Sequence, residues 1–356
     1  MLMQINQLYK KQNMSPKNLN ASKKTHKLLL KKLKDKEIFE LYNKFEKEFK
    51  LKEDFIVAIS GGPDSLALSF LTKVYSIKKS LKVKYFIVDH KLRKNSTTEA
   101  RFVKNLLKEK LSAELSILTW NGKKPKSNIQ SIAREKRYSI LTNQAKKLKI
   151  NNILLGHHND DLIENFFIRI LRGSGLNGLI SLDKKSDYKK VNLIRPLLKF
   201  TKQDLKDISE KIFETYIQDP SNKNDKFKRV KIRNFLENLQ SEGLDLDKFN
   251  LTIKNLKIAN DSINFFTEKN LRENVIMLKK KNSMMLNRDF FSHPEEVVFR
   301  SLTEVIKIIG KRFYPVRGKK IAKIVKQVKN NSLTKATLGN CIIKLVNNSI
   351  IVSKEY

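Results

Sequence analysis

The stretch Phe55-Ile-Val-Ala-Ile-Ser-Gly-Gly-Pro-Asp-Ser-Leu66 is an apolar run that ends in two glycines and a proline. Such a run predicts a buried strand followed by a tight turn. Asp64 and Ser65 then open an apolar-periodic segment, which predicts a helix. A glycine-rich turn at a helix N-terminus presents unpaired N–H groups and a favourable dipole to phosphate. An ordinary strand-to-helix turn also uses glycine, so the two glycines alone do not show that this turn binds phosphate.

The complete string Ser60-Gly-Gly-Pro-Asp-Ser65 is more specific. It lacks the lysine of the GxxxxGK[ST] phosphate loop, which disfavours a kinase or a GTPase. It resembles the PP-loop of the ATP pyrophosphatases, which bind ATP through its pyrophosphate and transfer AMP to an oxygen of the substrate. The resemblance implies that ATP is bound by Ser60, Gly61, Gly62, Pro63, Asp64 and Ser65.

Length and composition limit the class of protein. The chain has 356 residues, of which 40% are hydrophobic, enough for two or three globular domains. It has neither an apolar run of about 20 residues nor an N-terminal apolar segment, so we expect no membrane span and no secretory signal. The single cysteine, Cys341, excludes a disulfide framework or a cysteine-based zinc site within one chain. It fits a reducing compartment, and we expect a cytoplasmic protein.

The net charge of +38 indicates a polyanionic partner, with nucleic acid favoured over a membrane surface. The chain is rich in lysine, asparagine and isoleucine throughout, as AT-biased coding produces. Part of the excess of lysine can therefore have a second explanation: AT-biased coding can place lysines on solvent-exposed surfaces without any binding function.

Strand-like and helix-like patterns alternate after residue 50. Strands are predicted at residues 55–59, 83–88, 114–118 and 152–155, and helices at 65–78, 97–111 and 128–148. This alternation predicts an α/β fold, a parallel sheet with helices on both faces. Ligands of such sheets bind beyond the carboxyl ends of the strands.

Polar motifs follow the second strand and lie on the third helix. Asp89 and His90 end the strand, where they could contact adenosine or ribose, or belong to a polar loop that caps the next helix. Arg134 and Arg137 share one helix face at i, i+3 spacing. Spacing alone fits phosphate or substrate contacts as well as a solvated, salt-bridged face.

The fourth strand runs into His157-His158-Asn-Asp160-Asp161-Leu-Ile-Glu164. The three carboxylates lie about one helical turn apart and can point to the same place. Acidic residues are also common at a helix N-terminus simply because the helix dipole stabilises their negative charge. Adjacent histidines in a strand point to opposite faces, which disfavours a zinc site. Magnesium, held by one or two carboxylates and by ATP phosphates, is the metal that we expect.

Together, these motifs resemble the tRNA(Ile)-lysidine synthetase family. The resemblance covers roughly residues 54–236 and continues through Arg172-Gly-Ser-Gly175, Ile194-Arg195-Pro196-Leu197, Asp219-Pro-Ser-Asn222, Phe227-x-Arg229 and Ile232-Arg233. Two residues depart from the family pattern: Asn165 replaces a usual threonine, and Val230 replaces an asparagine.

The resemblance implies a reaction and its components. The family joins free L-lysine to C2 of the wobble cytidine of isoleucine tRNA with a CAU anticodon, through an adenylated cytidine. AMP and pyrophosphate are released, and the codon read changes from AUG to AUA. ATP and Mg²⁺ are implied, with Asp64 as metal ligand and Asp64, Asp160, Asp161, Glu164 and Arg134 as catalytic residues. Asp89 and His90 are implied at the nucleotide, and the substrate or tRNA contacts at Arg137, His157, His158, Arg172, Arg195, Arg229 and Arg233.

We expect three regions in the chain. Residues 1–50 form a basic extension with a helix at 27–49, and residues 51–240 form the PP-loop catalytic domain, adenine nucleotide α-hydrolase-like. Residues 241–356 form a mainly helical tRNA-binding region, with helices at 246–270, 295–309 and up to Lys329, and a terminal β hairpin that turns at Asn347 and Asn348. A homodimer is compatible with the sequence.

Two alternatives belong to other classes of protein. A PP-loop enzyme that thiolates tRNA uses cysteine persulfides or an iron–sulfur cluster, and a chain whose only cysteine is Cys341 argues against it. A non-catalytic RNA-binding protein on a decayed fold would not be expected to keep both the phosphate loop and the acidic cluster.

Overall fold

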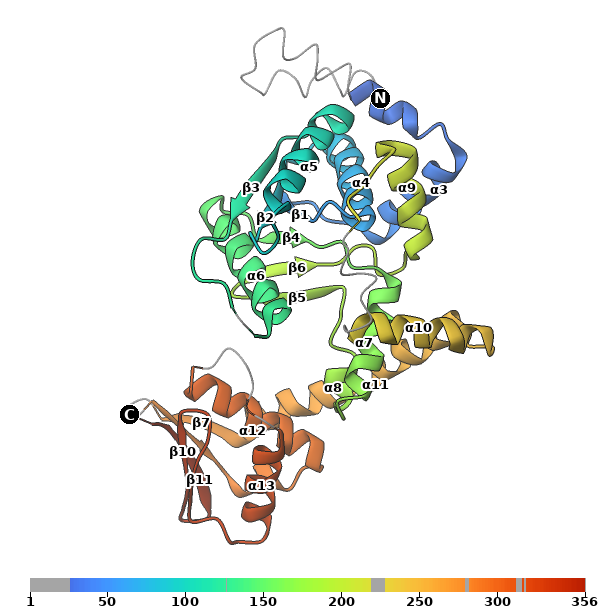
Figure 1. Cartoon of the computed structure of the whole chain (residues 1–356). Coiled ribbons are helices and arrows are strands. Elements are labelled where there is room, and N and C mark those ends of the chain that lie inside the picture. The colour runs from blue at the N-terminus through green and yellow to red at the C-terminus, as the bar shows by residue number, and fades with distance from the viewer. Residues whose placement is uncertain are drawn as a thin grey trace. The chain divides into compact units, whose positions relative to one another are not determined.

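The computed structural model describes residues 26–125, 127–218, 228–278, 282–311, 316 and 318–355. The motif residues 219–222 and Phe227 lie outside these ranges, as do residues 1–25 of the basic extension. The chain divides into two compact units, Met1–Leu244 and Asp245–Tyr356 (Figure 1). Within the described ranges, we find no helix whose length and hydropathy would let it traverse a bilayer.

The first unit contains a six-stranded sheet in the order β3-β2-β1-β4-β6-β5. The strands are β1 (Phe55–Ile59), β2 (Val83–Asp89), β3 (Leu115–Thr119), β4 (Asn152–Leu154), β5 (Lys185–Tyr188) and β6 (Val191–Ile194). Neighbours are parallel except for β5, which pairs antiparallel with β6. The four predicted strands are confirmed to within one residue at each end, whereas β5 and β6 were not predicted as strands.

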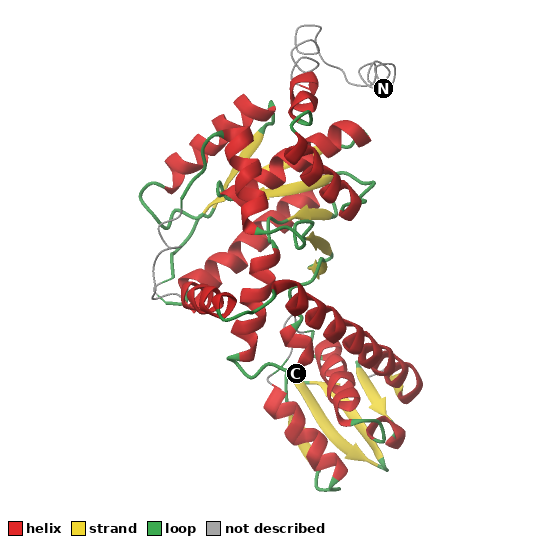
Figure 2. Ribbon diagram, turned by 90° about the vertical axis from the view of Figure 1, so that its right-hand side faces the viewer, coloured by secondary structure: helices red, strands yellow, loops and turns green. Residues whose placement is uncertain are grey.

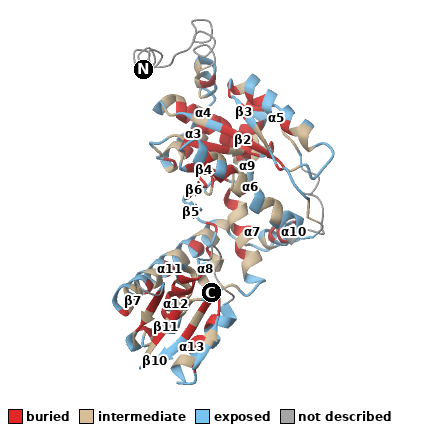
Figure 3. Ribbon diagram, turned by 90° about the vertical axis from the view of Figure 1, so that its left-hand side faces the viewer, coloured by how far each residue is buried: buried red, intermediate tan, exposed pale blue. Residues whose placement is uncertain are grey.

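The two faces of this sheet carry separate cores, because side chains alternate along a strand. Val57 of β1 packs with α3 (Lys36–Glu48), α4 (Pro63–Lys79), α5 (Ser96–Leu111) and α9 (Lys202–Phe213). Its neighbour Ile56 packs on the other face with Tyr138 and Leu141 of α6 (Ile129–Lys147). Figure 2 shows the strands lying among the helices. The inner strands β1, β2, β4 and β6 are largely buried, whereas the edge strands β3 and β5 are more exposed (Figure 3). The predicted α/β architecture with helices on both faces is confirmed.

The helix predicted at residues 27–49 is interrupted. A turn at residues 33–35 separates a short helical segment from α3, and the Asp35 carboxylate caps α3 by accepting from the Ile38 N–H. Phe45 of α3 packs edge-on against Tyr75 of α4, with ring centroids 6.1 Å apart. Lys44 pairs with Asp204 of α9 at 2.9 Å. This helix is therefore built into the first core.

The described part of the first unit also contains α7 (Asn159–Ile170), α8 (Leu176–Leu179) and α10 (Lys228–Ser241). At the start of α7, Asp161 Oδ2 accepts from the His158 N–H at 3.2 Å, and His158 Nδ1 lies 3.3 Å from the Asp160 nitrogen. Because α7 follows β4 directly, its first turn lies at the carboxyl end of the sheet, where ligands are expected.

The second unit holds a five-stranded antiparallel sheet in the order β7-β8-β11-β10-β9. Its elements are α11 (Leu246–Asn274), β7 (Val275–Leu278), β8 (Ser283–Leu286), η3 (Arg288–Phe291), α12 (Glu295–Ile309), α13 (Gly318–Lys329), β9 (Lys335–Thr337), β10 (Cys341–Val346) and β11 (Ser349–Lys354). The predicted terminal hairpin is the pair β10–β11, and Asn347 and Asn348 adopt positive φ at its turn. The sheet buries one face against α12 and α13 around residues such as Ile343 and Val352.

Candidate active site

The turn between β1 and α4 forms a cradle of backbone N–H groups. Ser65 Oγ accepts hydrogen bonds from the N–H groups of Ser60 and Gly61, each 3.1 Å long. It donates to the Gly62 carbonyl oxygen at 3.0 Å. Converging N–H groups of this kind form an anion nest, and the hydroxyl oxygen occupies the place of an anionic oxygen.

Gly61 is required by the geometry of this cradle. Its φ is +88°, and a Cβ atom here would lie 2.8 Å from Ile217 Cδ1 and from Val103 Cγ2. The Gly61 carbonyl oxygen also accepts from the Ile217 N–H at 2.9 Å. A side chain would therefore be strained by the backbone and would collide with its neighbours.

The N-terminus of α4 opens onto the same cradle. Gly62 caps the helix without a side-chain hydrogen bond from any described residue, and Pro63 occupies its first turn. Proline suits that position because it has no N–H to satisfy. The remaining first-turn N–H groups and the helix dipole favour a phosphate.

Two contacts from distant parts of the chain hold the cradle in place. A Cβ on Gly156, which follows β4, would lie 3.3 Å from backbone atoms of Asp64 and Ser65, so that only glycine allows this approach without a shift. Ser209 of α9 donates a hydrogen bond of 2.7 Å to the Pro63 carbonyl oxygen. Both residues lay outside the predicted site.

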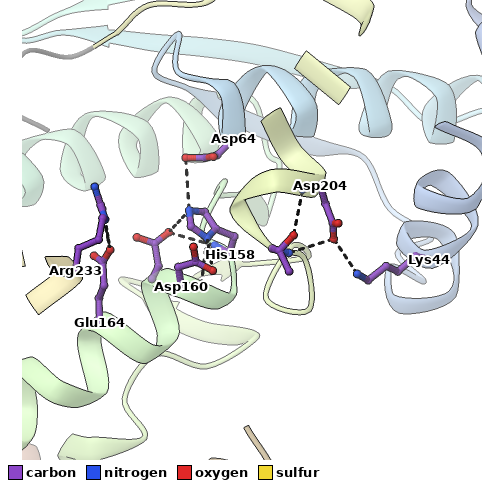
Figure 4. A network of polar contacts seen from close by, with 9 residues as sticks. Lys44, Asp64, His158, Asp160, Glu164, Asp204 and Arg233 are labelled. Atoms are coloured by element: carbon purple, nitrogen blue, oxygen red, sulfur yellow. Dashed lines mark hydrogen bonds and ion pairs between the residues drawn. The ribbon is translucent and has the colours of Figure 1, made fainter. Parts of the chain in front are cut away.

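His158 joins the cradle to the acidic turn of α7 (Figure 4). Its Nε2 lies 3.7 Å from Asp64 Oδ2 and 3.6 Å from Asp161 Oδ2, and its Nδ1 lies 3.8 Å from Asp160 Oδ1. The imidazole is buried, whereas Asp160 and Asp64 keep 38% and 32% of their side chains exposed. The structure thus brings Asp64, Asp160 and Asp161 together around one ring.

The charges of this cluster are unequal. Burial lowers the pKa of His158, but the carboxylates of Asp160, Asp161 and Asp64 outweigh it and raise that pKa to about 9. Burial raises the pKa of Asp64, in spite of His158. Burial also raises the pKa of Asp161, but the charges of His158 and Arg229 outweigh burial, and the pKa of Asp161 is lowered. Asp64 therefore carries the least compensated charge of the three.

Glu164 lies one turn further along α7 and forms an ion pair with Arg233 of α10. Both Nε and Nη2 of Arg233 donate to Glu164 Oε1, at 2.9 and 2.7 Å. Burial raises the pKa of Glu164 despite this arginine, and its second oxygen, Oε2, is buried without a described hydrogen-bond partner. Glu164 is thus a paired carboxylate beside the cluster rather than a member of it.

The other histidine of the motif faces the arginines of α6. Arg134 Nη2 lies 3.3 Å from His157 Nε2, and its guanidinium lies 5.0 Å from the Tyr138 ring. Burial, together with Arg134, lowers the pKa of His157 to about 3. His157 is therefore neutral and accepts from Arg134, which leaves its Nδ1 as the protonated nitrogen.

Asp89 and His90 lie at the end of β2. Asp89 Oδ1 accepts from the Lys91 N–H at 2.9 Å, and Oδ2 accepts from Thr97 Oγ1 at 2.6 Å, so the carboxylate organises the turn into α5. The His90 ring packs edge-on against Trp120, with centroids 5.9 Å apart. Burial and the nearby Arg137 and Lys124 lower the pKa of His90 to about 4.

The remaining predicted arginines are placed differently. Arg195 is buried and donates to the Asp183 carbonyl oxygen at 2.8 Å and to Ser186 Oγ at 3.0 Å, so it braces the connection into β5. Arg137 stacks 5.5 Å from the Tyr138 ring. Arg172 and Arg229 are exposed. Arg229 nevertheless lies near enough to the carboxylates for its charge to act on Asp161 and Glu164, whereas the described contacts of Arg137 and Arg195 lie elsewhere.

The residues at the cluster fit a magnesium ion, although no group of three or more metal-binding side chains is preassembled within the described ranges. Asp64 Oδ1 is buried and has no described hydrogen-bond partner, and a second carboxylate lies across His158. Mg²⁺ characteristically uses one or two carboxylates and completes its shell with water and substrate phosphate. The carboxylates of Asp64 and Asp161 match this preference of Mg²⁺.

Lys202 is a residue that the sequence reasoning missed. It begins α9, and its charge lowers the pKa of Asp64 and of Asp160. The Asn159 N–H donates to the Phe200 carbonyl oxygen at 3.0 Å, which sets the start of α9 beside the start of α7. The sequence analysis predicted no helix here, although Thr201 and Asp204 form a capping box, and no local pattern shows that this helix start lies beside α7.

The chain is similar to known PP-loop proteins. The model of a PP-loop domain family matches residues 31–240. The tRNA(Ile)-lysidine synthase of Orientia tsutsugamushi (strain Boryong) is 32% identical over 330 residues, which cover 89% of this chain and 72% of that protein. The chain belongs to the tRNA(Ile)-lysidine synthase family. A second family member, from Wolbachia sp. subsp. Brugia malayi (strain TRS), is 32% identical over 84% of this chain and 70% of its own length.

A solved structure shares the fold beyond the family. The U34-tRNA thiolase NcsA from Methanococcus maripaludis, with its [4Fe-4S] cluster, superposes with a TM-score of 0.53 at 18% identity, over 63% of this chain and 78% of that one. Family membership makes this chain a PP-loop ATP-binding ligase of tRNA modification.

Proposed function

We propose that this enzyme joins free L-lysine to C2 of the wobble cytidine of isoleucine tRNA with a CAU anticodon, with release of AMP and pyrophosphate. One observation carries the proposal: the phosphate cradle at Ser60–Ser65 and the acidic start of α7 meet at a single imidazole, His158. A site that activates an oxygen with ATP and then admits an amine needs these two halves side by side.

The cradle serves the first half of the reaction. The N–H groups of Ser60 and Gly61, with the N-terminus of α4, would hold the pyrophosphate of ATP in place of the Ser65 hydroxyl. Attack of the cytidine oxygen on the α-phosphate would then give the adenylated base. Asp64 with Asp161 would hold Mg²⁺, which when bound neutralises phosphoryl charge.

The carboxylates of α7 serve the second half. The ε-amine of lysine has a reference pKa near 10.4, so it must lose a proton before it attacks. Asp160 is the most exposed of the three carboxylates and is the best placed to receive an ammonium group from solvent. Glu164 is almost fully buried, and its Oε1 already accepts both hydrogen bonds from Arg233. We therefore assign the holding of the amine to Asp160 and a supporting role to the Glu164–Arg233 pair.

The C-terminal region is proposed to contribute to tRNA affinity. Its helix α13 carries lysines at 319, 320, 323, 326 and 329, around a buried stripe of Ile321, Ile324 and Val325. Lysines of this kind neutralise phosphates without reading sequence. A homodimer is compatible with this function.

The test is incorporation of labelled lysine into unmodified bulk tRNA with ATP and Mg²⁺, followed by nuclease digestion. We expect a labelled, modified cytidine with the wild-type enzyme and none with Asp64→Ala. Cleavage of ATP that depends on tRNA but leaves no label would keep the adenylation and reject lysine as nucleophile. Near-normal activity of Asp64→Ala would reject the metal role.

Thiolation is the second reaction to consider, since the solved thiolase shares the fold. Iron–sulfur clusters are held by several cysteine thiolates, and this chain has one cysteine, which is buried in the second unit. That count leaves ligation as the proposed reaction.

A further inference from the structure

One face of α7 continues beyond the carboxylates as an apolar surface. Asp160, Glu164, Phe167 and Leu171 follow one another at spacings of four, three and four residues, which places them on the same side of the helix. At about 1.5 Å of rise per residue, Phe167 lies roughly 10 Å along the axis from Asp160. The apolar end of this face is thus next to the proposed reaction centre.

Helix α10 adds a second aromatic ring to this surface. Phe235 packs edge-on against Phe167, with centroids 6.0 Å apart and ring planes at 74°. The same two helices are joined by the Glu164–Arg233 ion pair. The aromatic pair therefore has its position set by the contact that also fixes Glu164.

The surface is unusually open for its composition. Phe235 is 49% exposed and Leu171 is 76% exposed. The same two helices carry exposed cations, namely Arg172 after α7 and Arg229 and Lys231 in the first turn of α10. Phe167 is half-buried, so Phe235 is the more open of the two rings; exposed aromatic rings near cations are the arrangement on which single-stranded nucleic acids stack their bases.

We propose that Phe167, Phe235 and Leu171 form a stacking platform for the nucleotides that flank the reacting base. The inference rests on the proposed function, because it takes RNA as the occupant. Sequence-specific RNA recognition uses unpaired bases stacked on aromatic side chains, and an anticodon loop offers such bases. A net charge of +38 and these exposed cations favour RNA over a second copy of this chain.

The experiment compares Phe235→Leu, Phe235→Trp and a control, Phe102→Leu. Phe102 is a similarly exposed phenylalanine (43%) on α5 of the same unit. Leucine keeps the apolar contact with Phe167 but removes the π-face, whereas tryptophan keeps a face for stacking. Binding of unmodified tRNA is measured by filter retention, and KM for tRNA, ATP and lysine by labelled-lysine incorporation.

We expect Phe235→Leu to weaken tRNA binding and to raise KM for tRNA by roughly fivefold or more, the effect of losing about 1 kcal/mol of stacking. KM for ATP and lysine should stay unchanged, Phe235→Trp should bind like the wild type, and Phe102→Leu should have no effect. Equal tRNA binding by Phe235→Leu and wild type would overturn the platform.

Two further outcomes would also overturn it. One is a rise in KM for ATP as large as that for tRNA, which would mean that the change acts through the site's structure. The other is a wild-type dimer that Phe235→Leu dissociates in sedimentation, which would assign the surface to a second copy. Because filter retention needs no turnover, failure of lysine incorporation by the wild type would reject the proposed function while the platform is still tested.

Discussion

The hydroxyl of Ser209 donates a hydrogen bond of 2.7 Å to the carbonyl oxygen of Pro63, across 146 residues of chain. Ser209 is fully buried in α9, and Pro63 stands in the first turn of α4, directly after the phosphate cradle. The cradle is therefore braced from a helix that contributes no residue to it. Lys202, at the start of the same helix, acts on Asp64 and Asp160.

Loss of the hydrogen bond between Ser209 and Pro63 should weaken ATP binding at the cradle. Ser209→Ala leaves the Pro63 carbonyl without its partner, at an expected cost of about 1–2 kcal/mol in the free energy of unfolding. We expect KM for ATP to rise as well. The control is Ser76→Ala, which removes a hydroxyl bonded to the Lys73 carbonyl at 2.8 Å within α4 itself. Equal effects of both variants on KM for ATP would contradict the bracing role.

Asp64 and Asp161 should respond in opposite ways to loss of their charge. The pKa of Asp64 is raised, mainly by burial, so its ionised form destabilises the folded state at neutral pH. The pKa of Asp161 is lowered, since the charges of His158 and Arg229 outweigh burial, so its ionised form stabilises the fold. We expect Asp64→Asn to raise and Asp161→Asn to lower the free energy of unfolding, each by about 1 kcal/mol.

Both variants should nevertheless lose lysine incorporation, because both carboxylates are assigned to the metal. Urea denaturation in the absence of ATP and Mg²⁺ measures the stabilities, and titration of Mg²⁺ into the activity assay measures the function. A destabilised Asp64→Asn would show that His158 compensates the charge more fully than burial opposes it.

A comparison of Gly61 with Gly243 distinguishes the cost of backbone strain from the cost of a steric clash. Gly61→Ala combines a φ of +88° with contacts of 2.8 Å to Val103 and Ile217. Gly243 has a φ of +99° but nothing within 4 Å of the position of an added Cβ. We expect Gly243→Ala to cost about 1 kcal/mol, and Gly61→Ala to cost clearly more and to abolish ATP binding.

Thermal or urea unfolding gives the stabilities of these two alanine variants, and equilibrium ATP binding gives the functional effect. Normal ATP affinity in Gly61→Ala would show that the cradle has room for a side chain, against the geometry described above.

His90 should make the fold sensitive to mild acid. Its pKa is lowered to about 4 by burial and by Arg137 and Lys124, against 6.5 in an unfolded chain. Between these values the unfolded state binds more protons, so stability falls as pH falls from 6.5 towards 4. Each pH unit contributes at most about 1.4 kcal/mol, and less here because the ring is partly solvated.

The variant His90→Asn should therefore lose less stability than the wild type over that range. Urea midpoints at pH 7, 6 and 5 measure the difference. Parallel pH profiles of the two proteins would mean that His90 takes up its proton in the folded state.

Much of the fold followed from local signals in the sequence. The apolar run at β1 and its glycine turn predicted the cradle, because a strand, a positive-φ glycine and a helix start are each encoded by neighbouring residues. The acidic turn of α7 was predicted on the same basis. The turn at residues 33–35, and the strands β5 and β6, were not predicted; those strands are short and exist through pairing with each other and with β4.

The sequence by itself determined which groups this protein can offer: a phosphate cradle, three carboxylates near a helix start, two histidines and a set of arginines. Tertiary structure alone decided how they combine, because ion pairs and hydrogen bonds between distant segments leave no periodic trace in the chain. Folding brings Asp64 and Asp161 to the same nitrogen of His158 and closes Glu164 onto Arg233, 69 residues away. Folding also places Asp89 and Arg195 where they form hydrogen bonds with residues of neighbouring segments.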